Sequence, residues 1–120
     1  MRSKGSGLMF PKPGRQKKRK KHKESIVNTK SGECFLCAMV GDRRLKLTEE
    51  HHVLFGSGRR QISEAEGLKV HLCIPHHRTG ERAVHNCRET RELLCRIFQE
   101  EYEKTHTRAE WMAIAGKNYL

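Results

Sequence analysis

The 120-residue chain has no long apolar segment and few aromatic side chains. Hydrophobic residues make up 35% of it and aromatic residues 6%, and no stretch approaches the roughly 18 apolar residues of a membrane-spanning helix. The N-terminus lacks the apolar run of a secretory signal peptide. These absences predict one small cytoplasmic domain without a membrane segment, whose thin core would benefit from a metal cross-link.

Acidic residues are almost absent from the first quarter of the chain. Residues 1–30 contain eleven Lys or Arg and the single acid Glu24, a net charge of +10, whereas residues 31–120 carry a net charge of only +1. Residues 1–30 are therefore predicted to form a disordered basic tail that is drawn to nucleic-acid phosphates. A solubility tail or a targeting address remains the alternative. The densest run supplies the candidate nucleic-acid contacts Lys17, Lys18, Arg19, Lys20 and Lys21.

Two ligand pairs with metal-binding spacing lie about forty residues apart. Cys34 and Cys37 enclose two residues, and so do Cys73 and His76. Two intervening residues let one turn of backbone present both side chains to one ion, and Zn²⁺ accepts four N or S ligands in tetrahedral geometry. Cysteines of a cytosolic protein are more often ligands or thiols than disulfides. The spacing predicts a structural zinc ion, against the alternative of small core cysteines.

Five histidines crowd around these two pairs in addition to His76, at positions 51, 52, 71, 77 and 85. A single histidine would more often be a structural residue, but the crowding favours a site. His51 and His52 are consecutive on a predicted strand, so their side chains should point to opposite faces and do different jobs. Phosphodiester hydrolysis needs a base for water and a cation for the leaving oxygen, and neutral imidazole can accept a proton or bind a cation. The sequence thus predicts a second, hydrolytic metal site.

The hydrophobic pattern predicts a small α+β fold. A first strand is expected through roughly residues 45–54, followed by a Gly-rich turn or loop at 56–60 and a helical turn within 62–68. Alternation of apolar and polar residues predicts a second strand at 68–72. Pro75 suits the first turn of a helix, which would carry the two histidines that follow it.

The C-terminal third is predicted to be helical. Apolar residues recur at helical spacing through residues 86–104, which predicts one long amphipathic helix. Thr107 and Glu110 form a capping-box pattern that begins a last short helix, and Gly116 ends it. These elements make up a helical extension at about 86–116.

The order of the motifs resembles the ββα-metal nucleases called HNH endonucleases, specifically the small phage-encoded kind. The matching motifs are Cys-x-x-Cys, then acid-His-His-Val, a Gly-rich loop and Leu-Cys-x-x-His-His, within residues 34–86. The Lys-rich leader and residues 116–120 are also similar to such phage proteins. The resemblance implies that residues 31–120 form a zinc-stapled nuclease domain, in which two strands and a helix hold one divalent ion against the scissile phosphate.

The resemblance also implies roles for the histidines. His52 matches the general base that activates water. The divalent ion, which would be Mg²⁺, Mn²⁺ or Ni²⁺, is then held by His51 and His77 and stabilises the leaving oxygen, with His85 and Glu50 as further candidate ligands. The expected partner is DNA in the cytoplasm of a bacterial host cell, and other phage, replication or recombination proteins are further candidate partners.

Arg59 and Arg60 follow Gly58 on the predicted loop beside this site. Guanidinium groups match phosphates bidentately, so both residues are candidate contacts to the DNA backbone. A solvated loop without a binding role is the alternative.

One family feature is missing from this sequence. The family's middle Asn is expected about five residues before Cys73, where the sequence reads Glu-Gly-Leu-Lys-Val at 66–70. His71, Ser63 or a backbone carbonyl can take its place. The missing Asn favours the second hypothesis, a non-catalytic zinc-binding module that binds nucleic acid, whereas the retained histidines favour the metal-dependent DNA endonuclease.

Overall fold

We describe the protein from a computed structural model, which defines residues 22–56 and 58–120. The candidate contacts of the basic tail, Lys17 to Lys21, lie outside these residues. The described part is a small α+β fold, as predicted. Its elements are α1 (Phe35–Met39), β2 (Thr48–His52), α2 (Arg59–Glu66), β3 (Lys69–Cys73), η2 (Pro75–Thr79), α3 (Arg88–Tyr102) and α4 (Arg108–Ala115).

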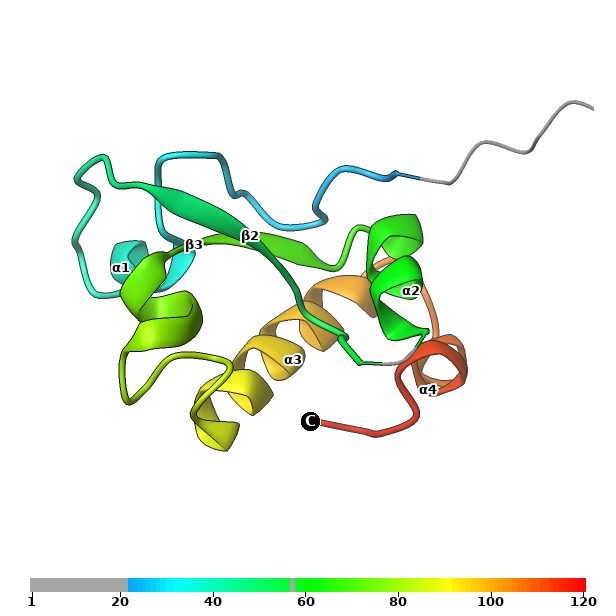
Figure 1. The fold of residues 1–120 in the computed structure, drawn as a ribbon. Coiled ribbons are helices and arrows are strands. Elements are labelled where there is room, and N and C mark those ends of the chain that lie inside the picture. The colour runs from blue at the N-terminus through cyan, green and yellow to red at the C-terminus, as the bar shows by residue number, and fades with distance from the viewer. Residues whose placement is uncertain (1–21, 57) are drawn as a thin grey trace, which may run out of the picture.

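Strands β2 and β3 form a two-stranded antiparallel sheet (Figure 1). Glu50 pairs with His71 and His52 pairs with Lys69. The first strand is shorter than predicted and covers Thr48–His52, and the consecutive residues Val53 and Leu54 that follow it are both buried in the core. Alternation ends at that point, so the strand ends there as well.

Residues 22–30 run along the sheet and α2, although the sequence placed them in the basic tail (Figure 1). The Ile26 N–H donates to the Gly67 carbonyl at 3.0 Å, and the His71 N–H donates to Thr29 Oγ1 at 3.0 Å. Gly67 has a φ of +74°, and a Cβ there would collide with the carbonyl oxygen of Glu24. The folded part therefore extends further toward the N-terminus than predicted.

Helix α2 begins within the segment that was predicted to be a turn or loop. Arg59 and Arg60 form its first turn, and Gly58 precedes it with a left-handed φ of 77°. Glycine adopts this conformation without steric cost, so the chain can reverse within two residues and start the helix early. Arg59 and Arg60 are thus exposed on a helix rather than on a loop.

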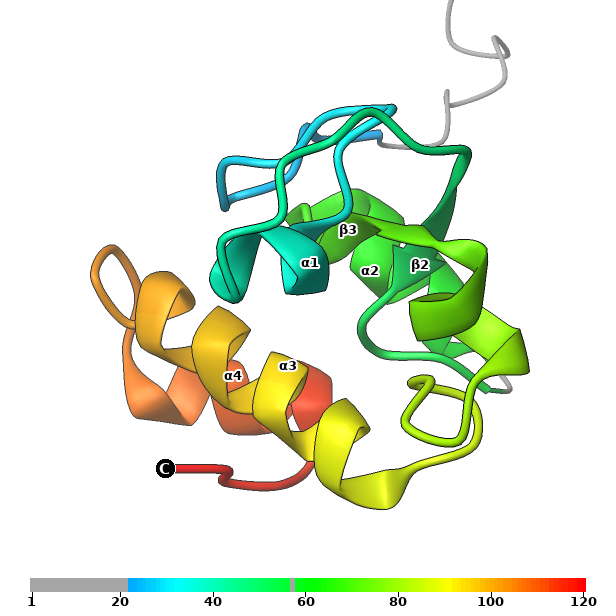
Figure 2. The same cartoon turned by 90° about the vertical axis from the view of Figure 1, so that its left-hand side faces the viewer.

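Helix α3 buries its predicted apolar stripe against the sheet and α4. Leu94 and Phe98 are fully buried, and they belong to one core cluster with Val70 and Leu72 of β3 and Trp111 of α4. Figure 2 shows α3 and α4 packed together beside the hairpin. Among the helices of the described ranges, none has the length and apolar character needed to cross a bilayer.

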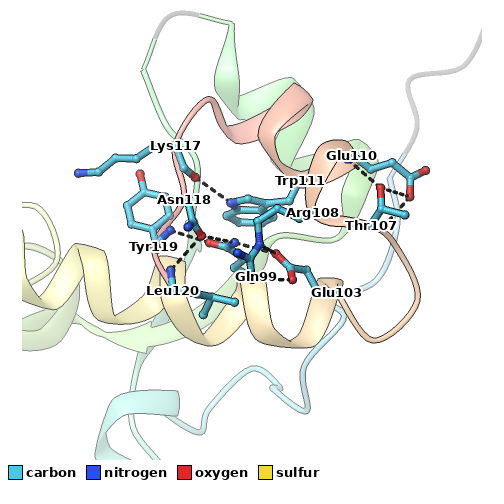
Figure 3. Close-up of polar contacts among 10 residues, drawn as sticks. All are labelled: Gln99, Glu103, Thr107, Arg108, Glu110, Trp111, Lys117, Asn118, Tyr119 and Leu120. Carbon is cyan, nitrogen blue, oxygen red and sulfur yellow. Dashed lines mark hydrogen bonds and ion pairs between the residues drawn. The ribbon is translucent and has the colours of Figure 1, made fainter.

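The C-terminal segment is fastened to the two last helices by side-chain hydrogen bonds (Figure 3). The predicted capping box of α4 is present, and the helix ends at Gly116. Trp111 Nε1 donates to the Lys117 carbonyl at 2.9 Å. Buried Gln99 donates to Asn118 Oδ1 at 2.8 Å and accepts from the Tyr119 N–H at 2.7 Å. These bonds fix the path of residues 117–119 along α3.

Replacing Gln99 by leucine should lower the free energy of unfolding by about 1–3 kcal/mol, because buried polar partners would lose their hydrogen bonds. Urea denaturation of the full chain measures this change. The neighbouring exposed Glu100→Ala should change stability by less than about 0.5 kcal/mol. A Gln99→Leu protein as stable as the parent would contradict the assigned role of this side chain.

Candidate metal centres

Three cysteines and one histidine converge at the end of the hairpin. Cys34 caps α1, and its Sγ accepts a hydrogen bond from the Cys37 N–H at 3.4 Å, which forms the predicted knuckle. Cys73 ends β3 and His76 lies one turn later in η2. All three cysteines are buried. The four ligand atoms lie within 4.8 Å of one another, so this Cys3His group can bind a structural metal such as zinc.

The spacing of the ligand atoms fits a tetrahedral ion. With Zn–S bonds of about 2.3 Å, tetrahedral geometry places two sulfur ligands roughly 3.8 Å apart. The Cys37 and Cys73 sulfurs are 3.8 Å apart, and His76 Nδ1 lies 3.3–3.4 Å from each of the three sulfurs. Burial and the adjacent thiols raise the pKa of Cys37 to about 11. A divalent cation among these sulfurs reverses that effect, because it binds thiolates.

A second cluster consists of His51, His77 and His85, which we call the histidine triad. His51 lies near the end of β2, His77 in η2 and His85 in the loop before α3. The ring centroids are separated by 5.3 Å for His51 and His77, 5.2 Å for His51 and His85, and 4.7 Å for His77 and His85. One nitrogen from each ring lies within 4.8 Å of the others. The structure therefore brings together three of the predicted ligands of the divalent ion.

Glu49 orients the central ring of the histidine triad. His77 Nδ1 donates to Glu49 Oε1 at 2.7 Å, because a carboxylate oxygen can only accept, and in the neutral ring this leaves the lone pair on Nε2. His77 Nε2 lies 3.1 Å from His85 Nε2. Arg78 in turn binds both oxygens of Glu49, at 2.9 and 3.0 Å. A carboxylate that fixes the tautomer of an imidazole is typical of histidines that bind metals.

The charge states of this cluster suit cation binding. Burial, reinforced by His77 and His85, lowers the pKa of His51 to about 3. Burial also lowers the pKa of His85, with a further contribution from His77. Arg78 and His77 lower the pKa of Glu49 to about 2. Near neutral pH the triad thus presents neutral His51 and His85 beside an ionised carboxylate.

His52 has different partners from its neighbour His51, as the alternation along the strand predicts. Its Nε2 donates to the carboxylate of Glu64 on α2. The same carboxylate accepts from Lys69 Nζ at 2.9 Å and contacts His22 Nδ1 at 3.0 Å. His22 and Lys69, with a smaller contribution from His52, lower the pKa of Glu64 to about 2. Glu64 is therefore an anion that holds the ring of His52.

Glu50 does not join the histidine triad, although it was a predicted candidate ligand there. It groups with His52 and Glu64 instead. Side chains alternate along a strand, so Glu49 and His51 share one face of β2 while Glu50 and His52 share the other. This alternation, applied to the glutamates, would have identified Glu49. Glu64 carries no comparable signal in the sequence, because its position depends on helix α2.

Ser63 ties α2 to the chain just beyond His52. Its hydroxyl donates to the Leu54 carbonyl at 2.7 Å and accepts from the Leu54 N–H at 3.0 Å. Ser63 is fully buried. His71, another candidate to replace the missing Asn, lies with Glu50 along a different hollow of the sheet. Among the candidate replacements, Ser63 thus makes two direct bonds to the segment that follows the two histidines.

The predicted DNA contacts Arg59 and Arg60 lie on the first turn of α2 and are exposed. Arg59 donates to the carbonyl of Ala115 at 2.8 Å, which ties α2 to the end of α4. This contact sets the direction of its guanidinium group.

Comparisons with protein-family models, with curated proteins and with solved structures found no match. The two candidate ligand groups therefore rest on their geometry alone.

Purified protein should retain about one tightly bound zinc ion per chain, and Cys34→Ser should lose it because a ligand is removed. Elemental analysis after dialysis measures the metal. Cys87→Ser changes a thiol outside the Cys3His group and should keep the ion. Parent protein without zinc would refute the structural metal site.

Proposed function

We propose that this protein is a metal-dependent DNA endonuclease of the HNH type, in which the hairpin and η2 form the catalytic centre. The proposal is supported by the coexistence of a closed four-ligand group and an open three-ligand group that meet at the β2–β3 hairpin and at η2. Structural zinc sites use four protein ligands, whereas catalytic sites usually supply three and leave a position for water or substrate. The Cys3His group matches the first type and the histidine triad matches the second.

The observation that carries the proposal is the Glu49–His77–His85 arrangement. Glu49 holds His77 in the tautomer that directs the Nε2 lone pair toward His85. His51 closes the group from the buried side, while His85 is exposed. Nitrogen donors thus converge at a point that solvent and substrate can reach.

A divalent cation held by His51, His77 and His85 would supply charge stabilisation to the leaving oxygen of a phosphodiester. The residues of the chain keep this centre in place. Arg78 neutralises Glu49, and Glu49 keeps His77 oriented. The Cys3His group fixes η2 through His76, which is the residue next to His77.

His52 is the proposed general base. Its Nε2–H is held by Glu64, so Nδ1 is the nitrogen that can accept a proton from water. Glu64 also stabilises the imidazolium that forms when the proton arrives, as an ionised carboxylate does for a catalytic histidine. His51 and His52 are the last two residues of β2. A phosphate across the strand end would therefore lie beside both.

With added Mg²⁺, Mn²⁺ or Ni²⁺, the parent protein should convert supercoiled plasmid to relaxed or linear DNA. His77→Ala and His52→Ala should each reduce the rate by about 100-fold or more, because one removes a metal ligand and the other the base. His106→Ala, which lies outside both clusters, is the matched control and should keep parental activity. Gel electrophoresis over time measures the rate.

Each variant tests a different part of the proposal. Loss of activity in His77→Ala with full activity in His52→Ala would remove the assigned base and leave the metal centre. A parent protein that holds zinc and binds DNA, yet leaves plasmid intact with all three metals, would establish the non-catalytic zinc-binding module instead.

Glu64→Gln should lower kcat by roughly 10- to 100-fold with little change in KM, because the neutral amide no longer stabilises the protonated ring of His52. Glu66→Gln changes a carboxylate two residues further along the same helix, outside the group formed by Glu50, His52 and Glu64, and should keep parental kinetics. Steady-state assays on a fluorescent oligonucleotide measure both constants. Parental kcat in Glu64→Gln would show that His52 works without this partner.

A further inference from the structure

A basic hollow of about 400 Å³ lies between the segment after β2, helix α3 and the C-terminal segment. Its wall includes one acid, Glu92. The cations that line it come from three distant parts of the sequence, and they are Arg59 of α2, Arg88 and Arg91 of α3, and Lys117 of the C-terminal segment. We call this feature the basic hollow.

The cations of the basic hollow outnumber its acid by three. Glu92 is shared, since it accepts from Arg88 Nε and from Lys117 Nζ, each at 3.1 Å. Arg59 and Arg91 each donate to a backbone carbonyl, those of Ala115 and Val84. These bonds hold the guanidinium groups without neutralising them. The hollow therefore presents excess positive charge on arginines that are already oriented.

The basic hollow adjoins the histidine triad. Phe55 lines the hollow and is 38% exposed. Its ring centroid lies 5.0 Å from that of His85 and 5.7 Å from that of His51. Arg91 approaches from the other side, because it binds the carbonyl of the residue before His85. A polyanion in the hollow can thus continue directly to the triad.

The C-terminal segment forms one wall of the basic hollow, and hydrogen bonds hold it in place. Lys117 lies between the Gly116 turn and Asn118, and its carbonyl accepts from Trp111 Nε1. Figure 3 shows the Lys117 side chain extending away from Trp111, while the Asn118 side chain and the Tyr119 backbone N–H bond to Gln99. The ordered C-terminal segment therefore gives this lysine a fixed base.

We propose that the basic hollow binds the phosphate backbone of the DNA strand next to the scissile phosphate. This inference rests on the proposed function for the identity of the polyanion. Guanidinium groups bind phosphate oxygens bidentately, and several of them along one wall suit successive phosphates better than a single small anion. Phe55 and Tyr119 add apolar surface on which a sugar or base can lie.

The test is a titration of a labelled DNA duplex with the full chain, without added divalent ions. Fluorescence anisotropy of the duplex measures binding. Arg88→Gln, Arg91→Gln and Lys117→Gln should each weaken binding by roughly 3- to 10-fold. Each should also reduce the slope of log K against log salt by about 1, as loss of one phosphate contact does. Glu92→Gln should instead tighten binding, because it removes the competing carboxylate.

Arg43→Gln and Lys104→Gln are matched controls, since they remove exposed cations that do not line the basic hollow. They should bind like the parent. Equal weakening in controls and hollow variants would show a general charge effect and overturn the proposal, as would unchanged affinity in the hollow variants. Melting temperature and zinc content verify that each variant is folded.

Two further outcomes separate this inference from the proposed function. If the parent never cuts DNA but the hollow variants lose DNA binding, the DNA-binding role of the basic hollow is supported and the nuclease proposal fails. If the parent cuts DNA and the hollow variants bind and cut like the parent, only the proposed DNA-binding role of the hollow is contradicted. Displacement of DNA by inorganic phosphate, at ionic strength matched with chloride, would assign a small-anion site and overturn the strand assignment.

Discussion

The Cys3His group is the constraint on which the rest of the molecule depends. It joins the short helix α1 to the end of β3 and to η2. A five-residue helix is too short to be stable alone, so its position must come from tertiary contacts. Fixing η2 at His76 also fixes the next residue, and through it the histidine triad.

The metal-ligand residues could be predicted from the sequence where they are only a few positions apart in the chain. Two residues between Cys34 and Cys37, and again between Cys73 and His76, were enough to predict the Cys3His group that the structure brings together. The capping box at Thr107 and the end of α4 at Gly116 were predictable for the same reason. Each of these features is decided by residues within one or two turns of backbone.

The partners of the histidines were harder to predict. They depend on which face of β2 each side chain occupies, and on helix α2, which begins earlier in the sequence than predicted. Glu49 rather than Glu50 lies beside the triad, as one step along a strand changes the face. Glu64 reaches His52 from helix α2, which begins at Arg59 and not at residue 62 as predicted. The cations of the basic hollow are scattered from residue 59 to 117. No cluster of basic residues in the sequence indicates them, whereas the basic tail is recognisable from such a cluster.

Adjacent residues of η2 belong to the two ligand groups, His76 to the Cys3His group and His77 to the histidine triad. This neighbourhood has a practical consequence for biochemical work on the protein. A strong chelator that removes a structural ion from the Cys3His group would also release the turn that carries His77. For the proposed nuclease, a loss of activity after chelation would therefore not show which ion the reaction needs. Adding a soft metal and a hard metal one at a time, and recording the spectrum that each gives with its ligands, would distinguish the roles of the two ions.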